Sequence, residues 1–121
     1  MPIERRHVGK RLSETVVFTP AGERLVYLAG QVAEDRTADI TTQAKQVVGA
    51  IDRLLAEVGS DKTRLLSATI FLPDMADFPA LNAVWEAWVV PGQTPARATV
   101  EAKLAHPDYK VEIQVVATAP A

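Results

Sequence analysis

The sequence predicts an α+β fold, in which two helices pack on one face of a mixed sheet. Short runs rich in β-branched and aliphatic residues lie toward both ends of the chain, and two apolar patterns of helical period lie between them. The predicted order is ββαβαββ. At 121 residues and 48% hydrophobic composition, residues 1–121 fit a single domain that buries about two thirds of its unfolded surface.

The first half of the chain predicts a hairpin followed by a helix. Strands are expected at 14–18 and 25–29, joined by a loop that contains Pro20 and Gly22. From Asp39 onward, apolar residues recur at steps of three and four, and Gly59 stands where a helix commonly ends. The apolar positions of this amphipathic helix are Ile40, Ala44, Val47, Val48, Ile51, Leu54, Leu55 and Val58.

The second half predicts a strand, a helix and a closing pair of strands. A strand at 65–72 ends at Pro73, and the next helix begins with Asp77 as N-cap and Pro79 in its first turn. Strands at about 97–104 and 110–118 then complete the chain, so we expect a hairpin at each end of the sequence. The apolar positions of the second helix are Phe78, Leu81, Val84, Trp85 and Trp88.

Two charged residues on the last strands suggest chemistry. Alternation of side chains assigns Arg97 and Glu112 to the polar side of their strands, and we expect that side to form one polar face. An arginine can bind a carboxylate with two parallel hydrogen bonds, and a glutamate can transfer a proton or position a water. The alternative is a face that is merely solvated. We expect Glu101 to form an ion pair with Arg97 rather than to act in catalysis.

Composition argues against several other functions. The net charge is −2 and no long basic cluster occurs, so we expect neither nucleic acid nor a membrane as partner. The chain has no cysteine, and His7 and His106 are far apart in sequence, so we expect no metal. No apolar run reaches the length of a membrane span, which favours a cytoplasmic protein.

Several segments resemble the Rid family of imine deaminases, also called the YjgF family, and are most similar to its RutC-like, YoaB-type branch. The resemblance runs from about Leu12 onward with the motifs in family order. It implies a chorismate-mutase-like fold, a homotrimer with ligand sites in the clefts between subunits, and hydrolysis of small 2-imino acids to 2-keto acids and ammonia without a cofactor. The segments are Leu28–Ala33, Gln43–Ala44 with Ile51, Ala68–Leu72, Phe78 with Leu81–Trp88, Pro95–Arg97 and Val111–Ile113.

The resemblance also implies roles for individual residues. Arg97 matches the arginine that binds the substrate carboxylate, and Glu112 matches the glutamate that activates water or transfers a proton. Asn82 matches an asparagine that borders the cleft, and Gly30 lies in the segment that lines it. Together they predict a site for a small 2-imino or 2-keto carboxylate.

Three predicted pocket positions depart from the deaminase pattern. Leu12 stands at the place of a tyrosine, Ala29 at the place of a serine and Thr99 at the place of a cysteine. The predicted pocket therefore has fewer polar groups than the family pattern, which bears on the substrate and the rate.

Three other functions remain open at this point. A non-catalytic protein that binds small carboxylates for regulation would keep Arg97 and do little chemistry. Chorismate mutase shares the fold, but its dianionic substrate calls for several cations, and the sequence near Arg97 offers no second arginine. An endoribonuclease needs a basic, aromatic surface and a pair of histidines for the acid and base steps, and this acidic chain offers neither.

Overall fold

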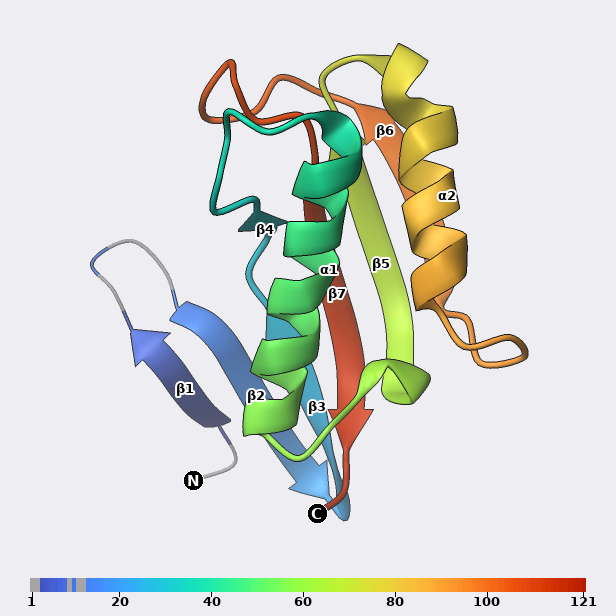
Figure 1. Cartoon of the computed structure of the whole chain (residues 1–121). Helices are drawn as coiled ribbons and strands as arrows, with labels where there is room; N and C mark the ends of the chain where they lie inside the picture. Colours follow the sequence, from blue (N-terminus) through green and yellow to red (C-terminus); the bar gives the residue numbers. More distant parts are fainter. Residues whose placement is uncertain (1–2, 9, 11–12) are drawn as a thin grey trace.

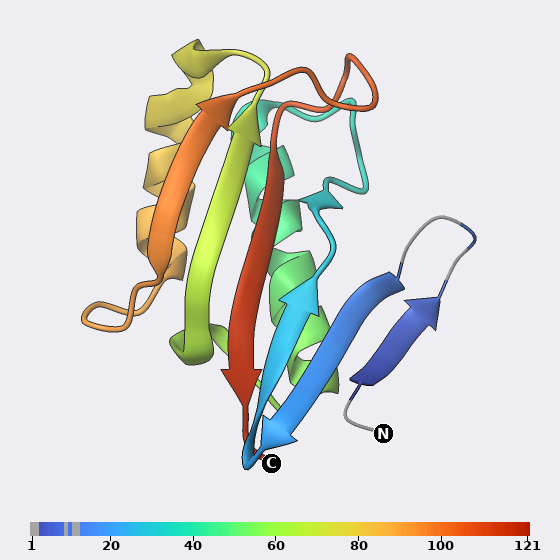
Figure 2. The same ribbon diagram turned by 180° about the vertical axis from the view of Figure 1, so that it is seen from behind.

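The computed structural model describes residues 3–8, 10 and 13–121, and it places two helices on one face of a seven-stranded sheet (Figure 1). Within these residues, the other face of the sheet carries no helix, as the view from behind shows (Figure 2). The predicted α+β class is therefore confirmed. The elements are β1 (Ile3–Val8), β2 (Ser13–Ala21), β3 (Glu23–Leu28), β4 (Gln31–Val32), α1 (Ile40–Glu57), η1 (Lys62–Arg64), β5 (Leu65–Leu72), η2 (Met75–Asp77), α2 (Phe78–Trp88), β6 (Ala96–Glu101) and β7 (Glu112–Ala119).

The sheet is mixed, as expected. Its strands follow the order β1-β2-β3-β7-β5-β6, and the short β4 pairs with β7 beside this path. The pair β5–β6 is parallel, and the other pairs are antiparallel. Helix α2 connects the two parallel strands, because parallel neighbours need a crossover rather than a tight turn.

The predicted hairpin at the C-terminal end is wrong. Strands β6 and β7 are consecutive in sequence, but β5 lies between them in the sheet. The connection from β6 to β7 covers residues 102–111, longer than the few residues that usually close a hairpin. This length lets the chain pass over the end of β5 and enter the sheet on its other side.

Two strands were not predicted from the sequence. Strand β1, with the sequence IERRHV, pairs with β2 at the edge of the sheet and is almost entirely exposed. It lacks an apolar face, and charged residues on an edge strand discourage pairing with other chains. Strand β4 contains only two residues, too few for alternation to reveal.

The core lies between the sheet and the two helices. It is formed by the apolar side chains of α1 and α2 together with alternate residues of β3, β5 and β7. Asp52 of α1 accepts a hydrogen bond of 2.9 Å from the Trp88 indole, which links the two helices. Fully buried members include Val26, Val47, Ile51, Leu55, Ile70, Leu72, Leu81 and Ile113. No helix in the described part of the chain is long and apolar enough to cross a membrane.

A buried glutamine fixes the long connection before β7. Gln43 of α1 is completely buried, and its Nε2 donates to the carbonyl of Asp108 at 3.0 Å. Its Oε1 accepts from the backbone N–H of Lys110 at 2.9 Å. Because a buried amide is costly unless its hydrogen bonds are made, this pairing holds residues 108–110 against the helix. The first residue of β7, Glu112, follows two positions later.

The helix ends follow the predicted signals with one difference. Asp39 caps α1 by accepting from the Thr42 N–H at 2.8 Å, and Gly59 follows the helix with a positive φ of 78°. Asp77 occupies the N-cap position of α2, but its side chain makes no capping bond. Instead, Asp74 accepts from the Ala76 N–H at 2.9 Å and caps the short η2 turn that precedes α2.

Replacing Asp39 by alanine should lower the melting temperature, because the N-terminus of α1 loses its cap acceptor. The hydrogen bond from the Thr42 N–H lowers the pKa of the Asp39 carboxyl from its ordinary value of 3.8. This stabilisation is therefore complete above pH 3.8 and is lost as the pH falls through the lower folded pKa. Thermal unfolding followed by circular dichroism tests both effects.

The matched control is Asp39→Asn, which keeps an acceptor oxygen but cannot be titrated. It should melt closer to the wild type than Asp39→Ala at neutral pH. The difference between the wild type and Asp39→Asn should shrink as the solution is acidified. Equal melting temperatures for Asp39→Ala and the wild type at neutral pH would show that the cap has no role in stability.

Candidate functional site

The two predicted site residues lie on strands that flank β5, and the register places them on opposite faces of the sheet. Arg97 of β6 is paired with Ala68, which is buried on the helix-covered face. Glu112 of β7 is paired with Phe71, three residues further along β5. Since successive side chains of a strand point to opposite faces, residues paired with Ala68 and Phe71 face opposite ways. The expectation of one shared polar face is therefore wrong.

The prediction that the polar side of each strand faces away from the helices is correct for β7 and reversed for β6. On β7, Ile113 and Val115 are buried toward the helices. Glu112 points to the face that the helices do not cover, which we call the open face. On β6, the apolar Ala98 and Val100 are exposed, Val100 by 42%, whereas Arg97 and Thr99 are half-buried. Alternation shows which residues of a strand share a side. It does not show which side the helices cover.

Arg97 lies against the aromatic side chains of α2. Its guanidinium carbon is 5.8 Å from the ring centre of Phe78 and 5.5 Å from that of Trp85. A cation over an aromatic face is stabilised by about 0.5–2 kcal/mol, depending on how far water is excluded. Within the described residues Arg97 forms no ion pair, so the expected pairing with Glu101 is absent. The guanidinium is held in place by rings and keeps its hydrogen-bond donors for a ligand.

Asn82 and Thr99 lie on the two elements that enclose Arg97. Asn82 follows Phe78 by four residues and precedes Trp85 by three, so the three share one face of α2. Thr99 is two residues after Arg97 on the same side of β6. The Asn82 Oδ1 and the Thr99 Oγ1 are both buried without a hydrogen-bond partner in the described residues. We name Phe78, Asn82, Trp85, Arg97 and Thr99 the Arg97 group.

Glu112 lies in a separate place, against the backbone of Gly30. A β-carbon built on Gly30 would stand 2.9 Å from the Glu112 Cδ and 3.2 Å from its Cγ, and nearer still to Oε2. Glycine is needed here because the carboxylate occupies the space of a side chain, although the φ of Gly30 is not positive. The half-buried carboxylate thus has one side fixed by backbone and the other open.

Hydrogen bonds hold the segment around Gly30. The Ala29 N–H donates to the Glu14 carbonyl at 2.8 Å. The Gln31 Nε2 donates to the Glu14 carboxylate at 2.8 Å and to the Ala29 carbonyl at 3.0 Å. The predicted site residues Ala29 and Gly30 therefore lie together with Glu112. Leu12, the remaining predicted site residue, lies outside the described residues.

Known proteins match the chain over nearly its whole length. The family model described as Endoribonuclease L-PSP matches residues 9–119. The RutC family protein YoaB of Escherichia coli is 43% identical over 117 residues, covering 97% of this chain and 98% of YoaB. A crystal structure of a YjgF-family protein from Neisseria meningitidis is 44% identical with a TM-score of 0.92, covering 100% of this chain and 98% of that one.

The chain therefore belongs to the Rid/YjgF family. The structural likeness confirms the chorismate-mutase-like fold that the resemblance implied. A more distant relative, named 3-aminoacrylate deaminase RutC in Acinetobacter baylyi, is 32% identical over 108 residues, covering 83% of this chain and 85% of RutC.

The structure adds two features of this Rid-family protein that sequence reasoning missed. The first is the packing of Phe78 and Trp85 on Arg97, because the sequence predicts both aromatic residues only as apolar positions of the second helix. Their spacing of seven residues on one helix face was the available signal. The second is the contact between Gly30 and Glu112, which joins residues 82 positions apart and has no signal in local sequence.

Gly30→Ala should move the Glu112 carboxylate without unfolding the chain, because the colliding atoms are the end of a flexible side chain. We expect a destabilisation of about 1 kcal/mol, the low end for overpacking. A crystal structure of the variant should show a new Glu112 rotamer. In a Glu112→Ala background the same glycine substitution should cost little, since the obstructing carboxylate is gone.

Gly49→Ala is the matched control, because a β-carbon on Gly49 meets no atom within 4 Å. This variant should be at least as stable as the wild type, since alanine favours the helix. An unmoved Glu112 in Gly30→Ala, or equal costs of Gly30→Ala in both backgrounds, would disprove the proposed contact.

Proposed function

We propose that this protein is a homotrimer that hydrolyses small 2-imino or enamino carboxylates to 2-keto acids and ammonia. The observation that carries the proposal is the placement of Arg97 and Glu112 on opposite faces of one sheet. A small ligand cannot bridge two faces of a sheet. The two residues can act on one substrate where the edge strand β6 of one subunit meets the open face of another.

The surface of the open face supports self-association. Phe18, Tyr27 and Val100 lie on this face and are 36%, 44% and 42% exposed. The sheet register places these three residues on the same face as Glu112. A large exposed apolar surface with interspersed polar groups is typical of a protein interface. A trimer would bury this face and enclose Glu112 from above.

In the proposed mechanism, Arg97 binds the substrate. Its guanidinium offers a planar pair of N–H donors to the carboxylate of a 2-imino acid. Phe78 and Trp85 limit the orientations of the guanidinium, so less entropy is lost on binding. Binding of the carboxylate fixes the distance between the C=N carbon and the Arg97 guanidinium. The C=N carbon then faces the groups of the neighbouring subunit.

Glu112 of the neighbouring subunit then serves as the base and the acid. It takes a proton from a water as the water oxygen bonds to the C=N carbon, and it returns this proton to the imine nitrogen to give a tetrahedral carbinolamine. The carboxylate then takes the proton of the new hydroxyl group and passes it to the amino group. The C=O bond forms as the C–N bond breaks, ammonia leaves and the 2-keto acid remains. One group that accepts and returns a proton is sufficient, so no metal or organic cofactor is required.

The relatives support this activity over the others considered. The name of the A. baylyi relative describes deamination of 3-aminoacrylate, a small enamino carboxylate. The family model is described as an endoribonuclease, but the described residues offer no pair of histidines to act as acid and base in RNA cleavage. His7 is hydrogen-bonded to Glu57 and His106 to the Asp108 backbone, so the two histidines do not form a pair.

A second function is favoured by one observation. Ala29 brings no hydroxyl to the segment beside Glu112. A site with fewer polar groups is consistent with a regulatory protein that binds small carboxylates without turnover. Binding of 2-keto acids without decay of any imine in a broad panel would select this alternative.

Arg97→Lys should weaken binding of a 2-keto acid about tenfold or more while the protein remains folded, because lysine keeps the charge but loses the planar pair of donors. Glu112→Gln should lower turnover about a hundredfold or more and leave 2-keto acid binding largely intact, because the amide cannot accept the proton. Calorimetric titration measures binding. Decay of imines generated in situ by amino-acid oxidases measures turnover.

Mixed trimers test whether one site uses two subunits. In trimers assembled at random from equal amounts of Arg97→Lys and Glu112→Gln chains, about a quarter of the intersubunit sites contain both native residues. Imine decay should recover to about a quarter of the wild-type rate, whereas each variant alone stays low. No recovery would place both residues within one subunit's site, in conflict with the register. A monomer in light scattering at micromolar concentration would exclude the trimer itself.

A further inference from the structure

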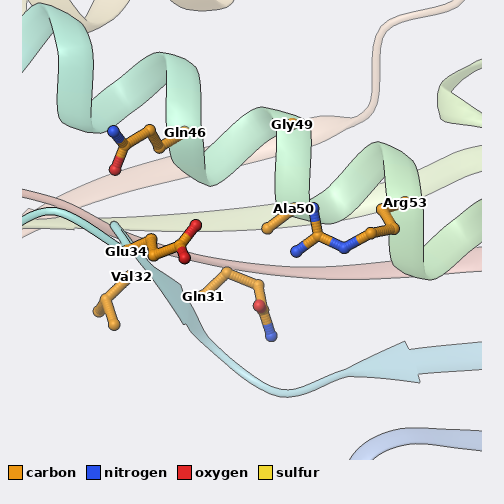
Figure 3. A pocket seen from close by; sticks show the side chains of 7 residues that line it. All are labelled: Gln31, Val32, Glu34, Gln46, Gly49, Ala50 and Arg53. Atoms are coloured by element: carbon orange, nitrogen blue, oxygen red, sulfur yellow. The ribbon is translucent and has the colours of Figure 1, made fainter.

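A polar cavity of about 610 Å³ lies between α1 and the segment that contains β4 (Figure 3), and no residue of the Arg97 group lines it. Its volume is in the range of about 300–1,000 Å³ that is usual for small-molecule sites. Nothing in the proposed imine chemistry uses it. The lining residues are Gln31, Val32, Glu34, Gln46, Gly49, Ala50 and Arg53.

The helical wall of the cavity is one face of α1. Gln46, Ala50 and Arg53 follow one another at steps of four and three residues and so lie on the same side of the helix. Gly49 in the same wall has no side chain, and a β-carbon there would meet no atom within 4 Å. The wall is therefore open at its centre and carries polar groups on either side.

The opposite wall is fixed to the helix. The Asp35 backbone N–H donates to the Gln46 Oε1 at 2.9 Å, which holds the residue after Glu34 against α1. At the other side, Gln31 is held by its hydrogen bonds to Glu14 and to the Ala29 carbonyl. The cavity is thus bordered by anchored segments, and its charged lining residues are Glu34 and Arg53.

These two charges have opposite signs and remain separate. Figure 3 shows the Arg53 guanidinium directed toward Ala50 and the Glu34 carboxylate directed toward the same space. Within the described residues neither one forms an ion pair. The acid that competes for Arg53 is Glu57, one turn later on α1, and it already accepts a hydrogen bond of 2.7 Å from His7.

We propose that this cavity binds a free amino acid in its zwitterionic form, with the carboxylate on Arg53 and the ammonium group on Glu34. A guanidinium accommodates a carboxylate with two hydrogen bonds, and a carboxylate accepts the donors of an ammonium group. A ligand with both charges satisfies both walls, whereas a simple anion or a simple amine leaves one charge unpaired. The site is distinct from the Arg97 group and does not depend on imine hydrolysis.

Calorimetric titration of the intact protein with leucine, N-acetyl-leucine and leucine methyl ester tests the charge requirement. The acetyl compound keeps only the carboxylate, and the ester keeps only the ammonium group. Leucine should bind, and each analogue should bind about tenfold more weakly or worse, the usual effect of losing one charge-assisted hydrogen bond. Equal affinity for leucine and either analogue, or no binding of leucine at millimolar concentration, would overturn the proposal.

Variants test the location. Arg53→Met and Glu34→Gln should each weaken leucine binding about tenfold or more, and Lys45→Met and Glu86→Gln, matched charge losses at exposed positions outside the cavity, should not. Gly49→Leu should block the cavity without removing a charge, while Gly49→Ala should leave room. Arg97→Lys should bind leucine normally. Loss of leucine binding in Arg97→Lys with normal binding in Arg53→Met would assign the ligand to the other site.

Discussion

The register of β5 with its two neighbours is the constraint on which the candidate site depends. A parallel pairing with β6 on one side and an antiparallel pairing with β7 on the other determine which side chains each strand presents to each face. A shift of one residue in either pairing would exchange the faces of that strand. The buried residues of β5 and β7 oppose such a shift, because it would expose apolar side chains and bury polar ones.

The same register explains why a subunit of this protein is incomplete for the proposed chemistry. One chain supplies a guanidinium held by aromatic rings at the edge strand and a carboxylate held against glycine on the open face. Each side chain is held in place by different contacts. The aromatic rings of α2 hold Arg97, and the Gly30 segment holds Glu112. Association would complete the site without remodelling either half, which is the advantage of preorganised groups.

Hydrogen bonds of amide side chains connect helix α1 to the loop before β7 and to the rim of the polar cavity. Gln43 ties the loop before β7 to α1, so the position of Glu112 follows from the position of that helix. The same helix supplies Gln46, which anchors the rim of the polar cavity. Helix α1 therefore contributes to both regions through amide side chains, the buried Gln43 at the loop before β7 and Gln46 at the rim of the cavity.

Periodicity in the sequence was enough to predict the α+β class, both helices and most strands, because local alternation and helical spacing reflect burial directly. Alternation on the last strands predicts Arg97 and Glu112 as candidate site residues and the family resemblance supports them, whereas Gly30 and Asn82 rest on the resemblance alone. The sequence alone could not show that β5 separates β6 from β7, that Arg97 faces α2, or that Glu112 fills the space beside Gly30. Those features depend on strand order and register, which are determined by contacts between residues far apart in the chain, and only the tertiary structure decided them.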